Sequence, residues 1–204
     1  MVNLGNYAKL SFGEALLKIV SILVRGIYYD RPMPPDMKIK TVINNVTRYG
    51  TRVFIETGTY LGETTEAVAP FVEKAYTIEV SEDLANKAKE KFKNVPNVTV
   101  IQGDSGIILK DIIRDINERC FFWLDSHYSG GITSKGKKET PIIEELETIL
   151  THKVKNHIIF VDDARCFNLS NYYPLADHLL RLIEEHGSNY KMILRNDIIR
   201  LLPR

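Results

Sequence analysis

From residue 52 onward, short apolar segments alternate with segments in which apolar residues recur every three or four positions. The short segments are rich in Val, Ile and Phe, which is typical of strands that are covered on both faces. Five are predicted strands: 52–57, 75–80, 98–102, 120–124 and 157–161. Five segments with the longer period are predicted helices: 63–72, 82–92, 106–116, 141–150 and 175–186. This alternation predicts a doubly wound α/β fold with a mostly parallel sheet and helices on both faces.

Two features modify this pattern. The apolar runs 190–195 and 198–202 are separated only by Asn196 and Asp197, which predicts a hairpin and therefore one antiparallel strand at the end of the sheet. Pro70 lies inside the helix predicted over 63–72, so we expect that helix to be short or kinked.

Residues 1–50 are predicted to form two helices that precede the main domain, 51–204. Ser11 and Glu14 make a capping box for the first, 11–29, which has an apolar stripe and is too short to span a bilayer. The second, 36–49, begins with Asp36 as its cap and ends at Gly50, and its stripe is Ile39, Val42, Ile43 and Val46. We expect these helices to pack on the domain as a cap or substrate wall. A homodimer contact, a lid and a membrane-surface helix are the alternatives for the first.

Composition narrows the classes of partner. The 204 residues have a formal net charge of +1, which predicts no broad attraction to nucleic acid. No signal peptide or membrane-spanning segment is apparent, so no membrane partner is predicted. The two cysteines, Cys120 and Cys166, lie in apolar segments and suggest buried free thiols in a reducing cytoplasm.

The segment 56–62, Glu-Thr-Gly-Thr-Tyr-Leu-Gly, directly follows the first predicted strand and precedes a helix. Glycines at such a turn let the backbone approach a ligand closely, and the start of a helix offers free N–H groups to an anion. A dinucleotide fingerprint would be Gly-x-Gly-x-x-Gly, which this turn lacks. A nucleotide-binding dehydrogenase is therefore disfavoured.

The next two strands also end in polar residues. Glu79 ends the second strand, where a carboxylate can accept hydrogen bonds from ribose hydroxyls. Asp104 and Ser105 follow the third strand, where they can either contact an adenine edge or cap the following helix.

The order Glu-x-Gly-x-x-x-Gly, strand-end Glu and Gly-Asp-Ser, followed by further strand-end acids and a terminal hairpin, resembles the class I S-adenosylmethionine-dependent methyltransferases. The resemblance runs from about residue 52 to the end of the chain. It implies a seven-stranded sheet whose last-inserted strand is antiparallel. It also implies a bound S-adenosylmethionine with its ribose on Glu79 beside Val80 and its adenine near Asp104 and Ser105. The remaining cofactor-binding residues it implies are Glu56, Thr57, Gly58, Thr59, Tyr60, Gly62, Thr64 and Asp125.

Three further acids follow the fourth and fifth strands. Asp125 follows the fourth, and Asp162 and Asp163 follow the fifth, so all three are expected at one edge of the sheet. Carboxylates that converge repel one another unless a cation lies between them, and oxygen-only ligands favour Mg²⁺ or Ca²⁺. Asp162 and Asp163 can share an ion only if the chain turns between them. Arg165 could instead bridge these acids and remove the need for a metal.

This acidic group resembles that of the cation-dependent O-methyltransferases of the catechol, macrolide-sugar and rhamnosyl types. The resemblance implies that Asp125, Asp162 and Asp163 hold the ion, with Asp125 also catalytic. The catechol type has a lysine near the position of His127 or Tyr128, and His127 is here the candidate base. Tyr128 and Arg165 are further candidates for substrate contact.

The segment 125–140 is polar, rich in glycine and poor in aromatic residues, which favours a small-molecule acceptor such as a sugar or glycan hydroxyl. The alternatives are a metal-independent methyltransferase acting on nitrogen, protein or RNA, and a non-catalytic S-adenosylmethionine-binding module.

Overall fold

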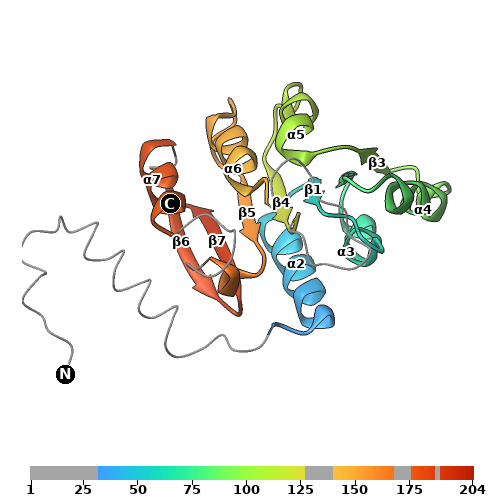
Figure 1. Cartoon of the computed structure of the whole chain (residues 1–204), viewed down its shortest axis with the longest axis horizontal. Helices are drawn as coiled ribbons and strands as arrows, with labels where there is room; N and C mark the ends of the chain where they lie inside the picture. Colours follow the sequence, from blue (N-terminus) through green and yellow to red (C-terminus); the bar gives the residue numbers. More distant parts are fainter. Residues whose placement is uncertain (1–31, 127–139, 168–175, 187–188) are drawn as a thin grey trace, which may run out of the picture.

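A computed structural model of the chain describes residues 32–126, 140–167, 176–186 and 189–204 (Figure 1). Its seven strands form one sheet in the order β3-β2-β1-β4-β5-β7-β6. The strands are β1 (Val53–Thr57), β2 (Lys74–Glu79), β3 (Val98–Gln102), β4 (Cys120–Leu124), β5 (Ile158–Val161), β6 (Tyr190–Arg195) and β7 (Ile198–Pro203).

The direction of the strands follows the prediction. Strands β1 to β5 are parallel, and β7 runs antiparallel between β5 and β6. Asn196 and Asp197 turn the hairpin with φ angles of 55° and 58°, and two successive positive φ angles mark the hairpin turn that suits twisted strands. The predicted α/β fold with one inserted antiparallel strand is therefore confirmed.

Helices cover both faces of this sheet (Figure 1). They are α2 (Pro35–Tyr49), α3 (Glu63–Val68), α4 (Glu82–Phe92), α5 (Ser105–Ile113), α6 (Ile142–Thr151) and α7 (Ala176–His186). Buried residues of α5, α6 and α7 form one apolar cluster with the sheet, which includes Leu109, Leu146 and Leu179. Buried residues of α2 and α3 join Phe121 and Trp123 in a second cluster on the other face. Because helices cover both faces of the sheet, the strands β1, β4 and β5 are buried along their whole length.

Local sequence signals fix the helix ends. Helix α3 stops at Val68, and Pro70 lies in the 3₁₀ turn Ala69–Phe71 that follows, so the expected shortening is confirmed. Gly50 ends α2 in the left-handed conformation with φ 58°, also as predicted. The predicted cap at Asp36 is wrong: α2 begins one residue earlier at Pro35, and Asp36 lies in its first turn. Proline suits the first helical position because its missing N–H would have no partner there.

Helix α2 packs on the domain through Val42 and Val46, both buried. The helix predicted over 11–29 lies outside the described residues, and the prediction that residues 1–50 serve as a cap or dimer contact stays a prediction. Cys120 is buried in β4, whereas Cys166 is half-buried in the 3₁₀ turn Ala164–Cys166 rather than in a strand, and both thiols are free. None of the described helices is long and apolar enough to cross a membrane.

Candidate functional site

The glycine turn after β1 lies where the strand order reverses. The chain proceeds from β1 to β2 and β3 on one side, and β4 and β5 lie on the other, so β1 and β4 flank the position where open α/β sheets bind ligands. Gly58 has φ 88°, and a Cβ there would lie 2.8 Å from the carbonyl carbon of Asp125 and closer still to its oxygen. Its N–H donates to the carbonyl of Ile78 at 2.9 Å. Only glycine allows the turn to rest against the end of β4.

Glu56 supports this turn from inside the protein. Its side chain is 2% exposed and accepts hydrogen bonds from the hydroxyls of Thr65 at 2.5 Å and Thr77 at 2.8 Å. Thr77 in turn bonds Thr59, at 2.6 Å between the two hydroxyls. Burial raises the pKa of Glu56 to about 7, although these hydroxyls and that of Thr64 lower it. Glu56 therefore anchors the turn, and a direct contact with a cofactor stays a prediction for Glu56 and for Thr57, which is also buried.

Glu79, at the end of β2, connects the turn after β1 with the segment that follows β2. Its two carboxylate oxygens accept one N–H each, from Tyr60 and from Ser81, both at 2.9 Å. A carboxylate has about four acceptor positions, so two remain for further donors such as ribose hydroxyls. Val80 follows it and is half-buried. The strand-end position predicted for Glu79 is confirmed.

The two residues considered after β3, Asp104 and Ser105, make different contacts. Asp104 caps α5 by accepting the N–H of Gly106 at 3.0 Å, so the capping interpretation is confirmed. The hydroxyl of Ser105 points inward and donates to Glu145 of α6 at 2.6 Å. Sequence reasoning did not select Glu145. Its position on the buried face of α6, between Ile142 and Ile149, was the available signal.

The acids predicted to converge do lie at one edge of the sheet. The Asp125 N–H donates to the Thr57 carbonyl at 2.9 Å, and the Asp162 N–H donates to the Leu124 carbonyl at 3.0 Å. Burial raises the pKa of Asp162 and that of Glu56, and the charge of Asp125 raises both further, so the charges of these acids interact. Strands β2, β1, β4 and β5 are successive neighbours in the sheet, so Glu79, Glu56, Asp125 and Asp162 lie at or near the same edge.

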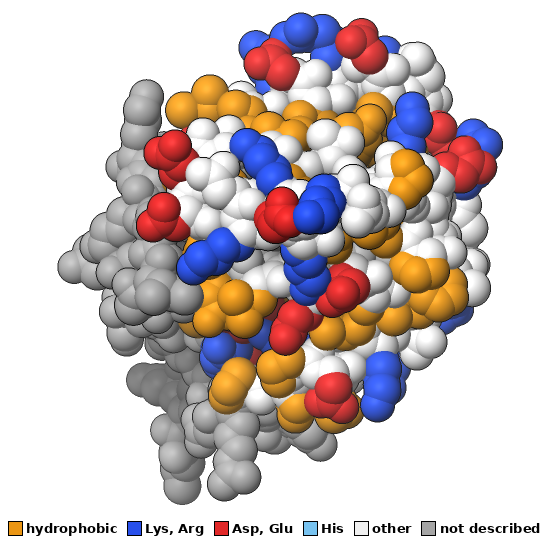
Figure 2. All heavy atoms as spheres, turned by 90° about the vertical axis from the view of Figure 1, so that its right-hand side faces the viewer, with side chains coloured by type: hydrophobic (Ala, Val, Ile, Leu, Met, Phe, Trp, Pro, Cys, Tyr) orange, Lys and Arg blue, Asp and Glu red, His pale blue; other side chains and the backbone are white. Residues whose placement is uncertain are grey.

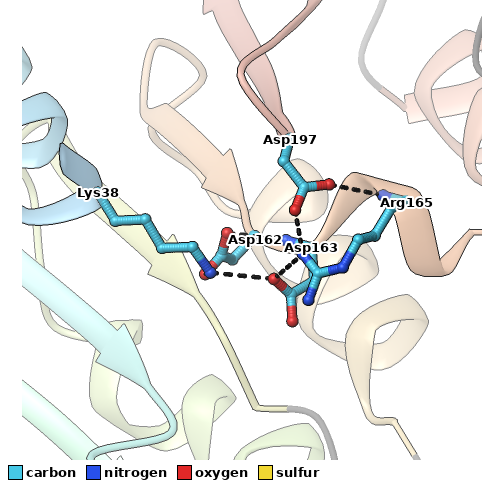
Figure 3. A network of polar contacts seen from close by, with 5 residues as sticks. All are labelled: Lys38, Asp162, Asp163, Arg165 and Asp197. Atoms are coloured by element: carbon cyan, nitrogen blue, oxygen red, sulfur yellow. Dashed lines mark hydrogen bonds and ion pairs between the residues drawn. The ribbon is translucent and has the colours of Figure 1, made fainter. Parts of the chain in front are cut away.

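A cation lies between Asp162 and Asp163, and it is the ammonium group of Lys38 (Figure 3). The Lys38 Nζ donates to Asp162 Oδ2 at 2.5 Å and to Asp163 Oδ1 at 3.0 Å. The chain turns between the two acids, as sharing a cation requires, because Asp163 is left-handed with φ 53°. Burial lowers the pKa of Lys38, but the charges of Asp162, Asp163 and Asp125 raise it further, so the ammonium stays protonated.

Arg165 supplies the second positive charge. Its guanidinium donates to Asp163 at 2.6 Å and to Asp197, the second residue of the hairpin turn (Figure 3). Of the three predicted acids, Arg165 contacts Asp163, which it links to Asp197, and its contact with a substrate stays a prediction. These bonds tie the β6–β7 hairpin to the end of β5.

The predicted metal site is not found. The described residues contain no group of three or more His, Cys, Asp or Glu side chains that could hold a metal ion. The physical reason is that Lys38 and Arg165 already neutralise Asp162 and Asp163, so these carboxylates do not need a metal to lie together. Asp125, the third predicted ligand, is half-buried beside them. His127, the predicted base, and Tyr128 lie outside the described residues.

Lys38 was missed because it belongs to α2, a helix with no chemical motif. It lies one turn before Val42 and two turns before Val46, on the buried face of that helix. A lysine in line with a buried stripe was the only signal in the sequence that it has a partner.

Comparisons with known proteins agree with this geometry. No family model matches the chain. The O-methyltransferase from Bacillus cereus in complex with S-adenosylhomocysteine aligns with a TM-score of 0.59 at 15% identity, over 93% of this chain and 90% of that one. TomG from Streptomyces achromogenes, an O-methyltransferase of tomaymycin synthesis solved with S-adenosylmethionine, aligns with a TM-score of 0.59 at 14% identity, over 96% and 92%. The chain has the S-adenosylmethionine-dependent methyltransferase fold.

One curated methyltransferase also matches part of the chain in sequence. A stretch of 64 residues is 34% identical to a probable cobalt-precorrin-6B C(15)-methyltransferase (decarboxylating) from Archaeoglobus fulgidus. That stretch covers 31% of this chain and 38% of the relative. These similarities establish the fold.

Proposed function

We propose that the chain is an S-adenosylmethionine-dependent methyltransferase that transfers a methyl group to an oxygen of a small acceptor. The observation that carries this proposal is the contact between the Gly58 turn and the backbone of Asp125, with the Glu79 carboxylate at the next strand end. This arrangement provides a close backbone approach and an acceptor for ribose hydroxyls at the reversal of strand order in a methyltransferase fold.

In this proposal the turn 58–62 binds the methionine part of S-adenosylmethionine and Glu79 binds its ribose. Asp104 and Ser105 lie beside the adenine, Asp104 through the part of its carboxylate that does not cap α5. The cofactor supplies an electrophilic methyl group. The protein must then hold the acceptor oxygen in line with that methyl group and remove its proton. Asp125, which abuts the turn, adjoins the reacting atoms.

On the acceptor side we assign the cationic role to Lys38 rather than to a divalent ion. An ammonium has three N–H donors, and two of those of Lys38 bind Asp162 and Asp163. The third is assigned to the acceptor oxygen, where a fixed positive charge favours the developing alkoxide. Because its pKa is raised, Lys38 does not act as the base. His127 remains the proposed base, with Tyr128 and Arg165 as substrate contacts.

The acceptor proposed is a sugar or glycan hydroxyl, on the polar and glycine-rich character of residues 125–140. The charge pattern on one face of the molecule favours a small acceptor over nucleic acid binding at that face. Figure 2 shows basic and acidic side chains interspersed with apolar ones on the face that it displays, where a nucleic-acid footprint would gather Lys and Arg. A cytoplasmic location and a homodimer stay predictions.

Calorimetry and a transfer assay test this function. We expect S-adenosylhomocysteine to bind and NAD not to bind. We also expect methyl transfer from labelled S-adenosylmethionine to a panel of sugars to persist in a chelator. Binding of NAD in preference to S-adenosylhomocysteine would refute the methyltransferase proposal. Transfer that stops in the chelator and resumes with Mg²⁺ would restore the metal-dependent alternative.

A further inference from the structure

Glu145 of α6 is a fully buried carboxyl group that the proposed reaction does not use. Its side chain is 0% exposed, and its Oε1 accepts two hydrogen bonds, from the hydroxyls of Ser105 and Ser126, both at 2.6 Å. Its second oxygen, Oε2, is buried and has no hydrogen-bond partner among the described residues. Two short serine side chains therefore supply both hydrogen bonds that Oε1 accepts.

The two serines come from different strand ends. Ser105 follows Asp104 at the end of β3, and Ser126 follows Asp125 at the end of β4. A third strand end lies close by, because the Thr57 hydroxyl at the end of β1 contributes to lowering the pKa of Glu145. A single carboxyl thus connects the proposed adenine side of the site with the segment that leads to the reacting atoms.

This contact is not explained by stability. The other buried residues of α6 are Ile142, Leu146, Ile149 and Leu150, so an apolar side chain at position 145 would continue the stripe. A buried carboxyl must instead be desolvated, and burial raises the pKa of Glu145 to about 7 despite the hydroxyl contacts. What the carboxyl adds is a fixed spacing between Ser105 and Ser126.

We propose that Glu145 is a positioning residue of the methyltransferase site, which holds the turn 104–105 in register with the segment 125–126. The inference rests on the proposed function, since it assigns the cofactor and acceptor to these two strand ends. Glu145 touches neither, and it acts through the two serine hydroxyls.

The first readout needs no ligand. Glu145→Leu removes both hydrogen bonds and introduces an apolar side chain of similar size, so the fold should persist while peptides covering 103–106 and 120–126 exchange amide hydrogen faster. Glu145→Gln should exchange like the parent protein, because the amide oxygen can accept from both serines. The matched control is Glu147→Leu, the same change two residues along α6 at an exposed position. This control should leave amide hydrogen exchange in both peptides at the rate of the parent protein.

The second readout is the reaction. A misplacement of about 1 Å can reduce a rate about 100-fold. We therefore expect Glu145→Leu to reduce kcat by one to two orders of magnitude with a smaller change in KM for S-adenosylmethionine, and Glu145→Gln to restore kcat to within about threefold. Ser126→Ala should reproduce most of the loss in kcat.

The outcomes separate the two proposals. If Glu145→Leu leaves exchange in both peptides unchanged, or if Glu145→Gln loses as much activity as Glu145→Leu, the positioning role is refuted. If the exchange pattern follows the prediction but the parent protein binds no S-adenosylhomocysteine, Glu145 orders these segments for some other site, and it is the proposed function that fails.

Discussion

Replacing Lys38 with Met tests whether its ammonium stands between the carboxylates of Asp162 and Asp163. The Asp162 side chain is 0% exposed and that of Asp163 is 4% exposed, so water cannot replace the ammonium as their partner in the variant. Lys38 is 18% exposed and comes from α2, which is separated from β5 by more than a hundred residues. Met keeps the length of the side chain and removes only the charge and the donors.

The expected loss of stability follows from this burial. Removing one partner of a buried ion pair costs about 3–5 kcal/mol, because the remaining charge stays buried without compensation. For a domain of this size each kcal/mol lowers Tm by roughly 2–4 °C, so calorimetric or fluorescence melting should show a decrease of roughly 6–20 °C. Asp162 already has a raised pKa through burial and through the charges of Asp125 and Asp163. Without Lys38 that pKa rises further, so the deficit relative to the parent protein should be largest at alkaline pH and shrink as the pH falls toward about 8 and Asp162 takes up a proton.

Two variants sharpen the measurement. Lys40→Met removes the other lysine of the same helix, which is 74% exposed and pairs with Asp36 at 3.5 Å, and it should change stability by less than about 1 kcal/mol. Lys38→Met combined with Asp162→Asn should regain part of the loss, since the uncompensated charge is removed. A decrease no larger for Lys38→Met than for Lys40→Met would refute this reasoning. Restoration of Lys38→Met by Mg²⁺ would instead show that the acids can hold a metal ion.

Two further predictions concern Gly58, in the turn after β1, and His157, directly before β5. Gly58→Ala should weaken binding of S-adenosylhomocysteine at least tenfold by calorimetry, because its Cβ would collide with the backbone of Asp125. Gly50→Ala, also at positive φ but with no atom within 4 Å of the new Cβ, should bind normally, and equal affinities for the two variants would contradict the assignment. His157 has a pKa lowered to about 3 by burial, so it folds neutral, and its stabilising contribution is present above its unfolded pKa of 6.5 and declines as the pH falls from 6.5 toward 3. His157→Gln should lose stability in acid less steeply than the parent protein, by up to about 1.4 kcal/mol for each pH unit in urea titrations, and parallel acid profiles would show that His157 is not the titrating group.

The fold could be predicted because each local signal agreed with the others. The edge strand Val98–Gln102 and the buried strand Cys120–Leu124 were both predicted with the observed bounds, since β-rich apolar runs were bounded by turn residues. The hairpin followed from Asn196 and Asp197, which tolerate the positive φ angles that its turn requires. Helix α3 ends at Val68, four residues before the end of the apolar periodicity, because Pro70 shortens it as expected.

The partners of the site residues could not be predicted in the same way. Periodicity identified the buried face of α2 but not what that face contacts, so the link from Lys38 to Asp162, 124 residues away, was invisible. The same holds for Glu145 and Ser105, which are 40 residues apart. Carboxylates that converge require positive charge, and Lys38 and Arg165 supply it here; Arg165 could be named from the sequence as an alternative to a metal ion, whereas Lys38 could not.

We propose that S-adenosylmethionine binds at the edge of the sheet where β1, β2 and β4 end, and a crystal structure of the chain grown with S-adenosylhomocysteine is the decisive experiment. We expect the ribose hydroxyls within hydrogen-bond distance of Glu79, the amino-acid part against the turn at Gly58, and the adenine beside Asp104. A ligand bound away from these three residues, with that edge closed by protein side chains, would contradict it.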